Sequence, residues 1–581
     1  MTDPLHGTGG HRLLYPHLAP IPEASATEAA PEANRDLSAT DTLGAARAAA
    51  DRGLEAPKRE FLVFMPKGGG PEGMVNTLKR IQSKVQARNS CDRSGRYVVT
   101  LTDAEAAQYK NAGMRVMEDY VYHLPPPIET AEANVTPLNE SVIRQVNGVE
   151  RVHRELGWEG EDLLFIMIDT GIGENEFLPR PALYDDMLTA EPNDPPRDPQ
   201  GHGTFGSGIA VANGNAENGE IRGVAPKATL AGMNVFEPSG GARVSTILAA
   251  LDRAIEWANR DEWKDKPVVV NLSLGGRAIG DRADSPLVQM INEMVREHGI
   301  FVSAAAGNSG PGLGTISDPA WAETAMAFAA SNHLGTETTA DDRIEDFSSH
   351  GDPDGPPGQN DKPDIAAAGV QRVSTRSGGG TAVSSGTSFS SPEGGAAAGV
   401  LLAGAYGLHQ EGLVKTTVRD MVRSMEIHDI FKETAFDMPN EPAYAEGAGD
   451  MRVYDAALLM LERHSTLNIV EREGTFRELI ETLKEDDGVL DSRDQLDILT
   501  GLSKLASEIT APSERLEFLS RAREIYTAAS ADLAPHTVTR LASVATELAC
   551  EAASELASAS PLSAEDAAAA LWVMFATAVS L

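Results

Sequence analysis

The sequence predicts an α/β protein whose main domain, residues 138–464, is built on a doubly wound, mostly parallel sheet. Three runs, Leu163–Ile168, Pro267–Leu274 and Gly299–Ala306, have the continuous hydrophobicity of strands that are covered on both faces. A helix rich in Gly and Ala is predicted over Gly203–Val211, where small residues allow close packing against a sheet. Sheets of this class carry their functional residues at the carboxyl ends of the strands.

A disordered arm and a small α+β unit are predicted ahead of this domain. Residues 1–58 are rich in Ala, Pro, Glu and Asp and show little periodicity, which is typical of disorder. Residues 59–125 predict strands, helices and a final extended run, and residues 126–137 a linker. The predicted elements are strands over Glu60–Met65 and Tyr97–Leu101, a helix over Pro71–Arg88, a helix to Asn111 opened by a capping box of Thr102 and Glu105, and an extended run over Met114–Leu124.

An acidic, all-α bundle is predicted for residues 465–581. Apolar side chains recur there at helical spacing, as in Phe476, Leu479, Ile480 and Leu483, and prolines separate the segments. The last apolar stretch, Ala567–Leu581, is shorter than the ~20 residues that span a bilayer. We therefore expect a buried terminal helix there and not a membrane anchor.

Four short motifs of the main domain carry the residue types of a nucleophilic hydrolase. The sequence LLFIMIDTGIG puts Asp169 at the end of a predicted strand, and GHGTFGSGIAVA puts His202 at the start of a helix. FVSAAAGNSG places Asn308 directly after a strand, and GTSFSSP places Ser388 at the mouth of a helix. A serine nucleophile needs a base to take its proton, and the base needs a carboxylate to fix its tautomer. Each motif alone could be a strand end, a loop or a helix cap. Their joint presence favours catalysis.

The chain order Asp, His, Ser resembles that of the subtilisin-like serine proteases, the subtilase family or peptidase S8 type. The segments Gly223–Phe236, Ile344–Gly351 and Lys362–Val370 resemble further parts of that family, and the resemblance covers most of residues 138–464. It implies a subtilisin-like fold and a serine endopeptidase acting on protein or peptide substrates.

The same resemblance assigns roles to the four motif residues. Asp169 would orient His202, His202 would act as base for Ser388, and Asn308 would donate to the oxyanion together with the Ser388 N–H at the positive end of its helix. Two departures are visible. Phe205 stands where the family usually has a second histidine or a similar polar residue, and Glu393 where it commonly has a histidine. Neither is a triad position, so these departures put partner contacts in doubt and not the chemistry.

The resemblance also implies an extended substrate held between two backbone edges. By position these are Gly240, Gly241 and Ala242 on one side and Ser273, Leu274 and Gly275 on the other; small side chains there would let a peptide backbone approach. The specificity pocket is expected near Ala304–Gly307, including Ala304 and Gly307, and around Ser317-Asp318-Pro319. Asp318 is a candidate selector of basic side chains. Because the chain is so acidic, we favour an exposed loop acid.

Residues 59–125 resemble the inhibitory propeptide of the same family, whose C-terminal tail lies through the active site. An accessory ferredoxin-like domain is the alternative. The resemblance implies a zymogen with its own N-terminal domain as an intramolecular inhibitor. Pro125, Pro126 and Pro127 stand where the cut in the family would fall. Because proline lacks an N–H and restricts the residue before it, we expect cleavage to be slow there or to shift into Glu129–Asn139.

Composition excludes several other classes of function. The 581 residues carry a formal net charge of −37, which argues against nucleic acid and anionic membranes as partners. Cys91 and Cys550 give neither a disulfide framework nor a metal-binding set. The first residues lack the basic and apolar segments of a secretory signal, which predicts a cytoplasmic protein or export without a classical signal peptide.

No cofactor is expected to be required. The loop Asn213–Glu220 occupies the place of a calcium loop in the family, but Leu178 stands where an aspartate would complete the site, so calcium is weakly supported and no tight site is predicted. A second hypothesis is a regulatory scaffold with an idle subtilisin fold and a C-terminal bundle that binds a protein partner. The intact set Asp169, His202, Asn308 and Ser388 favours the peptidase.

Overall fold

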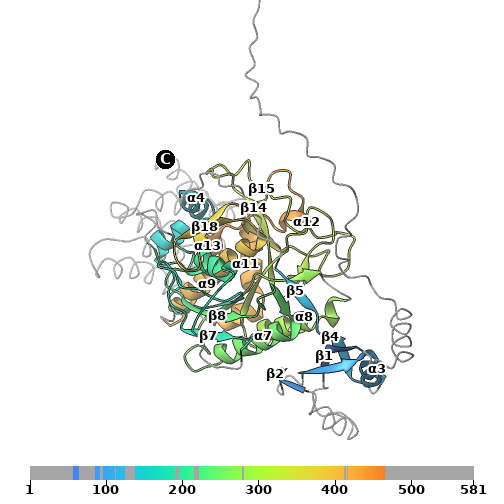
Figure 1. Cartoon of the computed structure of the whole chain (residues 1–581). Helices are drawn as coiled ribbons and strands as arrows, with labels where there is room; N and C mark the ends of the chain where they lie inside the picture. Colours follow the sequence, from blue (N-terminus) through green and yellow to red (C-terminus); the bar gives the residue numbers. More distant parts are fainter. Residues whose placement is uncertain are drawn as a thin grey trace, which may run out of the picture.

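A computed structural model gives the structure of the chain (Figure 1). It describes residues 57–64, 85–91, 96–111, 113–124, 138–189, 195–214, 221–277, 281–410, 412, 414 and 416–464. The predicted arm up to residue 56, the predicted linker and the predicted C-terminal bundle lie outside these residues. None of the helices in the described ranges combines the length and hydrophobicity needed to cross a bilayer.

An eight-stranded sheet forms the centre of the main domain. Its order is β15-β14-β12-β10-β6-β8-β7, with β16 also pairing β14, and every pairing is parallel except that of β14 with β15. The strands are β6 Leu164–Asp169, β7 Leu183–Asp186, β8 Thr229–Asn234, β10 Val268–Leu272, β12 Phe301–Ala305, β14 Met326–Asn332, β15 Arg343–Ile344 and β16 Ile365–Ala368. All residues of β6, β10 and β12 are buried, as their hydrophobicity predicts.

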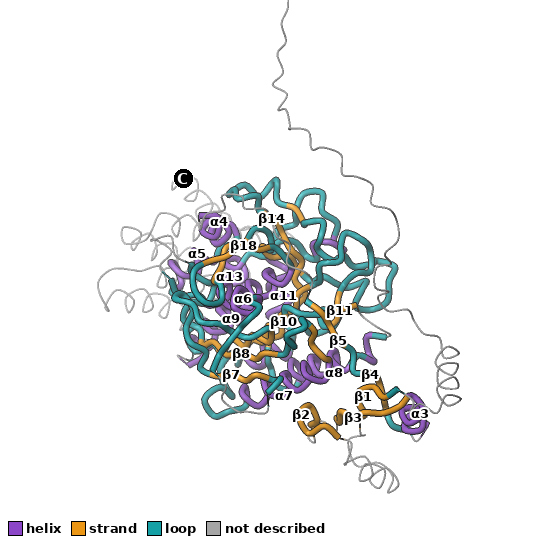
Figure 2. Tube along the Cα trace, in the orientation of Figure 1, coloured by secondary structure: helices purple, strands orange, loops and turns teal. Residues whose placement is uncertain are grey.

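Helices cover the sheet on two sides (Figure 2). α6 (His202–Val211) and α9 (Thr387–Gln410) lie on one side, and α7 (Val244–Ala258) and α8 (Pro286–Arg296) on the other. Glycines let α9 approach the strands closely. A Cβ built on Gly395 would lie 2.4 Å from Ser303 Oγ, and one on Gly399 would lie 2.5 Å from Leu163 Cδ2. The small residues that follow Ser388 are therefore required by packing.

Smaller elements complete this domain around the sheet. They are α4 Leu138–Val146, α5 Val149–Arg151, α10 Val418–Arg423, α11 Glu426–Thr434, α12 Ala443–Glu446, α13 Val453–His464, and the two-stranded pairs of β17 Arg372–Thr375 with β18 Thr381–Ser384 and of β11 Gly276–Arg277 with β13 Ser317–Asp318.

An antiparallel four-stranded sheet of order β2-β3-β1-β4 forms the N-terminal unit. Its elements are β1 Lys58–Phe64, β2 Val85–Cys91, β3 Arg96–Thr102, α3 Asp103–Asn111 and β4 Arg115–Glu118. The predicted capping box is present, because Thr102 N donates to Glu105 Oε2 at 2.8 Å and Glu105 N donates to Thr102 Oγ1 at 3.2 Å.

The helix predicted over Pro71–Arg88 is wrong at its C-terminal end. Residues 85–88 belong to β2, which pairs with β3 through Val85 opposite Val99 and Gln86 opposite Val98. Pairing with a strand that follows later in the chain overrides the helical pattern here, as tertiary context commonly does. Residues 71–84 lie outside the described ranges.

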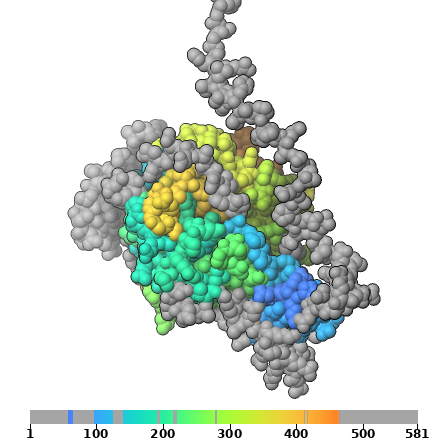
Figure 3. All heavy atoms as spheres, viewed as in Figure 1, coloured from blue at the N-terminus to red at the C-terminus, as the bar shows by residue number. Residues whose placement is uncertain are grey.

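The N-terminal unit lies against α7 and α8 of the main domain, where Figure 3 shows the blue unit beside the green surface. Asp119 accepts from Ser245 N at 2.8 Å and from Ser245 Oγ at 2.7 Å, so it supplies a carboxylate to the first turn of α7. Arg96, which is 1% exposed, pairs with Asp252 on the same helix. Arg115 donates to Gln289 Oε1 on α8 at 2.7 Å.

A buried ion network ties α4, β17 and α9 together. Arg372 holds Glu140 with two nitrogens, Nε at 2.9 Å from Oε1 and Nη2 at 2.8 Å from Oε2. Its Nη1 donates to Glu393 Oε2 at 2.6 Å, and Asn147 Nδ2 donates to Glu393 Oε1 at 2.6 Å. Burial raises the pKa of the Glu393 carboxyl against the opposing effect of Arg372. Glu393 is therefore part of a network that joins three elements.

Replacement of Arg372 tests this network. Arg372→Met would leave two buried carboxylates without their cation, and we expect the free energy of unfolding to fall by about 3–5 kcal/mol in urea unfolding at pH 7. Arg343→Met is the control, because the ion pair of Arg343 with Glu345 is half exposed and such pairs contribute about 0–1 kcal/mol. An equal, small loss in both variants would show that the network contributes little.

Candidate active site

Two of the predicted catalytic residues are in direct contact. Asp169 ends β6, and His202 begins α6. His202 Nδ1 lies 2.8 Å from Asp169 Oδ1, which also accepts from Thr170 N at 2.7 Å. When the Nδ1–H group donates to this carboxylate, the neutral imidazole has an unprotonated Nε2 that can accept a proton.

Asp198, which the sequence analysis did not single out, fixes the start of α6. Its Oδ1 accepts from Gly201 N at 2.7 Å, and its Oδ2 accepts from Thr204 N at 2.8 Å and from Thr204 Oγ1 at 2.6 Å. A carboxylate that caps the helix after His202 holds the ring in place. The signal in the sequence was an Asp four residues before the histidine, at a predicted helix start.

The environment of His202 raises the pKa of its imidazole above the ordinary value. Burial opposes the charge on the imidazolium, but the charge and hydrogen bond of Asp169, with the charge of Asp198, outweigh burial and raise the pKa of His202. Such a histidine takes up a proton more readily than an ordinary one.

Ser388 lies in the first turn of α9, beside Ser273, the residue that follows the carboxyl end of β10. Its hydroxyl makes a long hydrogen bond to Ser273 O at 3.5 Å, and Ser273 Oγ donates to Ser388 O at 2.7 Å. The ring of Phe389, the next residue, lies 5.5 Å from the His202 ring and 4.4 Å from the Phe205 ring. Phe205 thus supports the ring that packs against His202, which gives this departure from the family pattern a packing role.

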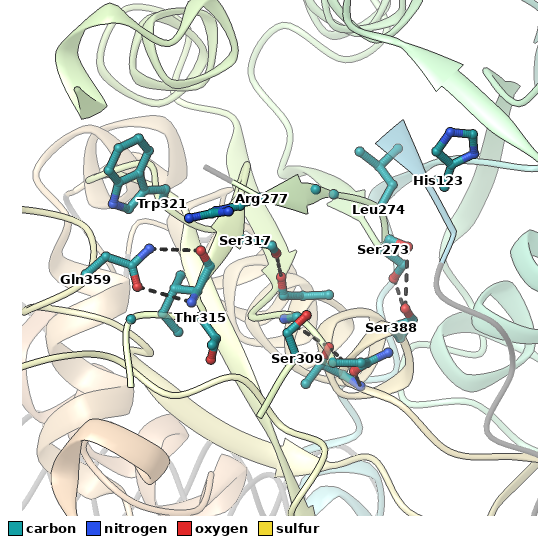
Figure 4. Close-up of a pocket in the computed structure, with 18 of the residues that line it drawn as sticks. His123, Ser273, Leu274, Arg277, Ser309, Thr315, Ser317, Trp321, Gln359 and Ser388 are labelled. Atoms are coloured by element: carbon teal, nitrogen blue, oxygen red, sulfur yellow. Dashed lines mark hydrogen bonds between the residues drawn. The ribbon is translucent and has the colours of Figure 1, made fainter. Parts of the chain in front are cut away.

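Asn308 is oriented by the residue before the serine. Its Oδ1 accepts from Thr387 N at 3.0 Å and from Thr387 Oγ1 at 2.8 Å. The Nδ2 group therefore points away from Thr387. Asn308 and Ser388 line one cavity of about 920 Å³. Figure 4 shows Ser388 in this cavity. The structure therefore brings an amide donor and a helix N-terminus to the same space as the serine.

Four of the nine predicted substrate-binding residues line this cavity, and five do not. The four are Ser273, Leu274, Gly275 and Gly307. Thr315, Ser317, Trp321 and Gln359 line the cavity across from Ser273 and Leu274 (Figure 4). The prediction for Ala304 is wrong, because Ala304 is fully buried in β12. Strand alternation turns Ala305 to the cavity in its place.

The predicted second edge, Gly240 to Ala242, is occupied by the N-terminal segment. Strand β5 (Val121–His123) pairs antiparallel with β9 (Gly241–Arg243), with Tyr122 opposite Ala242 and His123 opposite Gly241. Gly240 has a φ of +83°, which favours glycine at the turn before β9. His123, the last residue of β5, and Leu124, the residue after it, line the cavity. Figure 4 shows His123 at the edge of the cavity.

The favoured interpretation of Asp318 as an exposed loop acid is wrong. Asp318 is 4% exposed, and its Oδ2 accepts from Tyr122 Oη at 3.0 Å and from Ser285 Oγ at 2.8 Å. Burial raises its pKa to about 6, although the hydrogen bonds from Ser285 and Tyr122 act in the opposite direction. The sequence could not show this, because Tyr122 lies 196 residues away.

The candidate calcium loop falls mostly on residues that the structure does not describe. Asn213 and Gly214 are described, and residues 215–220 are not. The expectation of no tight calcium site therefore stays a prediction.

Comparison with known proteins agrees with the geometry. Residues 165–447 match the profile of the subtilase family. This part of the chain is therefore similar to the subtilases. The chain is 33% identical over 227 residues to "Serine protease AprX" of Bacillus subtilis (strain 168), which covers 38% of this chain and 48% of that protein. It is 33% identical over 266 residues to "Subtilisin" of Bacillus sp. (strain TA39), covering 44% and 57%.

A solved structure, "S41 Psychrophilic Protease", matches with a TM-score of 0.43 and 28% identity, covering 54% of this chain and 97% of that one. The chain spans about half the length of the curated subtilases it matches, 48% and 57% for the two named above.

The raised pKa of Asp318 predicts a pH dependence of stability. The ordinary pKa of an Asp carboxyl is 3.8, and that of Asp318 in the folded chain is about 6. As the pH rises through this range, ionising the buried carboxyl lowers the free energy of unfolding. Relative to Asp318→Asn, the wild-type free energy of unfolding should therefore fall by up to about 3 kcal/mol between pH 4 and pH 8, with most of the change below pH 7. Urea unfolding at each pH measures it. Asp354→Asn, at an exposed acid, should run parallel to wild type; parallel curves for both variants would show that Asp318 is not perturbed.

Proposed function

We propose that the chain is a serine endopeptidase that cleaves protein or peptide substrates with Asp169, His202 and Ser388, and that Asn308 stabilises the oxyanion. Two observations carry the proposal: His202 Nδ1 lies 2.8 Å from Asp169 Oδ1, and the His202 ring lies 5.5 Å from the ring of Phe389, the residue next to Ser388. Ser388 and Asn308 line one cavity. The names of the related proteins, a serine protease and a subtilisin, support the same reaction class.

In the proposed reaction, the Ser388 hydroxyl turns from Ser273 toward His202 and attacks the substrate carbonyl carbon. His202 Nε2 takes the proton, and Asp169 stabilises the imidazolium that forms. Asn308 Nδ2 and the backbone N–H groups of the first turn of α9 donate to the oxyanion. His202 then gives its proton to the leaving amine. Water, activated by the same histidine, releases the acyl group from Ser388.

We further propose that the N-terminal unit is an intramolecular inhibitor. Strand β5 occupies the edge of β9, and Leu124 reaches the cavity that holds Ser388. Asp119 and Arg96 anchor the unit to α7. Tethering gives such a segment a high effective concentration, so that a modest intrinsic affinity keeps the edge covered.

The scaffold hypothesis is the less favoured one. A catalytically idle chain has no need for the contacts that hold His202 and Asn308 in orientation. The partner of the C-terminal bundle and the cytoplasmic location remain predictions from sequence.

The triad is tested by single substitutions. Because the members of a triad act together, Ser388→Ala or His202→Ala alone should lower kcat by on the order of 10⁶, and the double variant by no more. Asn308→Ala should lower kcat by about 10²–10³. Hydrolysis of casein and of quenched peptides, with circular dichroism as a check on folding, measures these effects. Near wild-type hydrolysis by Ser388→Ala would falsify the proposal.

The inhibitor is tested in the full chain by replacing Pro125, Pro126 and Pro127 with alanine. The residues after β5 would then accept the geometry of a scissile bond, and we expect a new N-terminus in this region and a higher rate of peptide hydrolysis. Mass spectrometry of the termini and a peptide assay measure both. The same triplet change in the Ser388→Ala chain is the control, which should stay intact. Unchanged termini and an unchanged rate in the active chain would indicate a folding or accessory unit.

A further inference from the structure

We propose that Gly276, Ser285 and Asp318 form a side-chain subsite that selects tyrosine in substrates, and that Tyr122 fills it in the latent chain. These three residues are called the tyrosine pocket. The inference rests on the proposed peptidase function, because it names the substrate preference of that site.

The pocket is shaped around an aromatic ring. Tyr122 is 8% exposed, whereas its neighbours Val121 and His123 in β5 are exposed, so this one side chain of the strand turns inward. A Cβ built on Gly276 would lie 2.3 Å from Tyr122 Cδ1 and 2.8 Å from Cε1. The ring therefore occupies the volume that any other residue at position 276 would fill.

The pocket ends in a carboxylate that needs donors. Gly276 pairs with Asp318 between β11 and β13, so the ring site and the acceptor lie on facing residues. Asp318 Oδ2 accepts hydrogen bonds from the hydroxyl groups of Tyr122 and Ser285, and its Oδ1 is buried without a hydrogen-bond partner in the described part of the chain. Ser285 is oriented as the N-cap of α8, because its Oγ accepts from Val288 N at 3.4 Å.

These contacts favour tyrosine over phenylalanine and over basic residues. A phenylalanine would fill the ring site but leave the buried carboxylate with the single donor of Ser285. A site that binds a hydroxyl in this way rejects the analogue that lacks it. A lysine ammonium would have to lose the water around its charge and its three donors to enter the pocket. A phenol buries only one donor, and that donor forms a hydrogen bond to Asp318.

The position of the selected residue follows from the register of β5. A substrate strand that replaces β5 on β9 places one residue opposite Ala242, where Tyr122 now lies. That residue would enter the tyrosine pocket, and the chain would continue over two residues to the place of Leu124 at the cavity.

The test uses the full chain with Tyr122→Gly, which removes the anchor of the tail, and with Ser388→Ala, which prevents turnover. Binding of labelled peptides Val-X-His-Leu-Ala-Ala-Ala, with X as Tyr, Phe or Lys, is measured by fluorescence anisotropy. A lost hydrogen bond to a charged acceptor predicts that the Tyr peptide binds about 10- to 150-fold more tightly than the Phe peptide. Asp318→Leu should remove or reverse this preference. Asp352→Leu, at an acid that lines the cavity and lies outside the tyrosine pocket, should keep it.

Two outcomes overturn the pocket: binding of the Tyr and Phe peptides within twofold of each other, or tighter binding of the Lys peptide. The Tyr to Phe comparison needs no change at Asp318, so it stands even where Asp318→Leu does not fold. Gly276→Ala gives a second arm, because its methyl group would exclude both rings and weaken the Tyr and Phe peptides alike.

Hydrolysis of the same peptides by the Tyr122→Gly chain with Ser388 intact tests the peptidase separately. A binding preference for Tyr without Ser388-dependent cleavage would refute the proposed function and keep the pocket. Cleavage without a preference would do the reverse. In the otherwise unchanged chain, Tyr122→Phe should raise peptide hydrolysis by loosening the tail, and Asp318→Leu added to it should lower hydrolysis again.

Discussion

A carboxylate that leaves water must find donors within the fold, and this need organises the surroundings of the cavity. Asp169 finds the His202 ring and the Thr170 N–H at the end of β6. Asp198 finds the first turn of α6, which sets the position of the same ring. Asp318 finds two hydroxyl groups. In each case at least one donor comes from a residue several positions or more away in the sequence. The hydrogen bond to the carboxylate therefore helps to fix the position of the element that carries this donor.

The fold around the site could be predicted because its signals are local. Buried strands are continuous apolar runs, and a residue that follows such a run must lie at the carboxyl edge of the sheet. This places Asp169 and Asn308 without knowledge of the partners. His202 and Ser388 each begin a helix, and the glycines and small residues near them report close packing.

What could not be predicted depends on contacts between distant parts of the chain. Asp318 reads as an exposed loop acid because nothing near it in the sequence shows that Tyr122 will cover it. Glu393 and Phe205 read as departures from a family pattern until Arg372 and Phe389 are seen beside them. Residues 85–88 read as a helix because β3, the strand they pair with, follows later in the chain. Local pattern carries no information on such pairs.

In the proposed function, the contact of Tyr122 with Asp318 serves both the inhibition of the latent chain and its preference among substrates. A segment that covers the edge of β9 competes with every substrate for the pairing that β9 offers, and backbone pairing alone does not distinguish among sequences. Discrimination must come from side chains that turn inward, and in β5 only Tyr122 does so. An inhibitor held by the same hydroxyl that substrates must offer is displaced best by those substrates. The prolines that follow Leu124 then distinguish the inhibitor from a substrate. The segment binds as a substrate would, but its peptide bonds at the prolines resist cleavage.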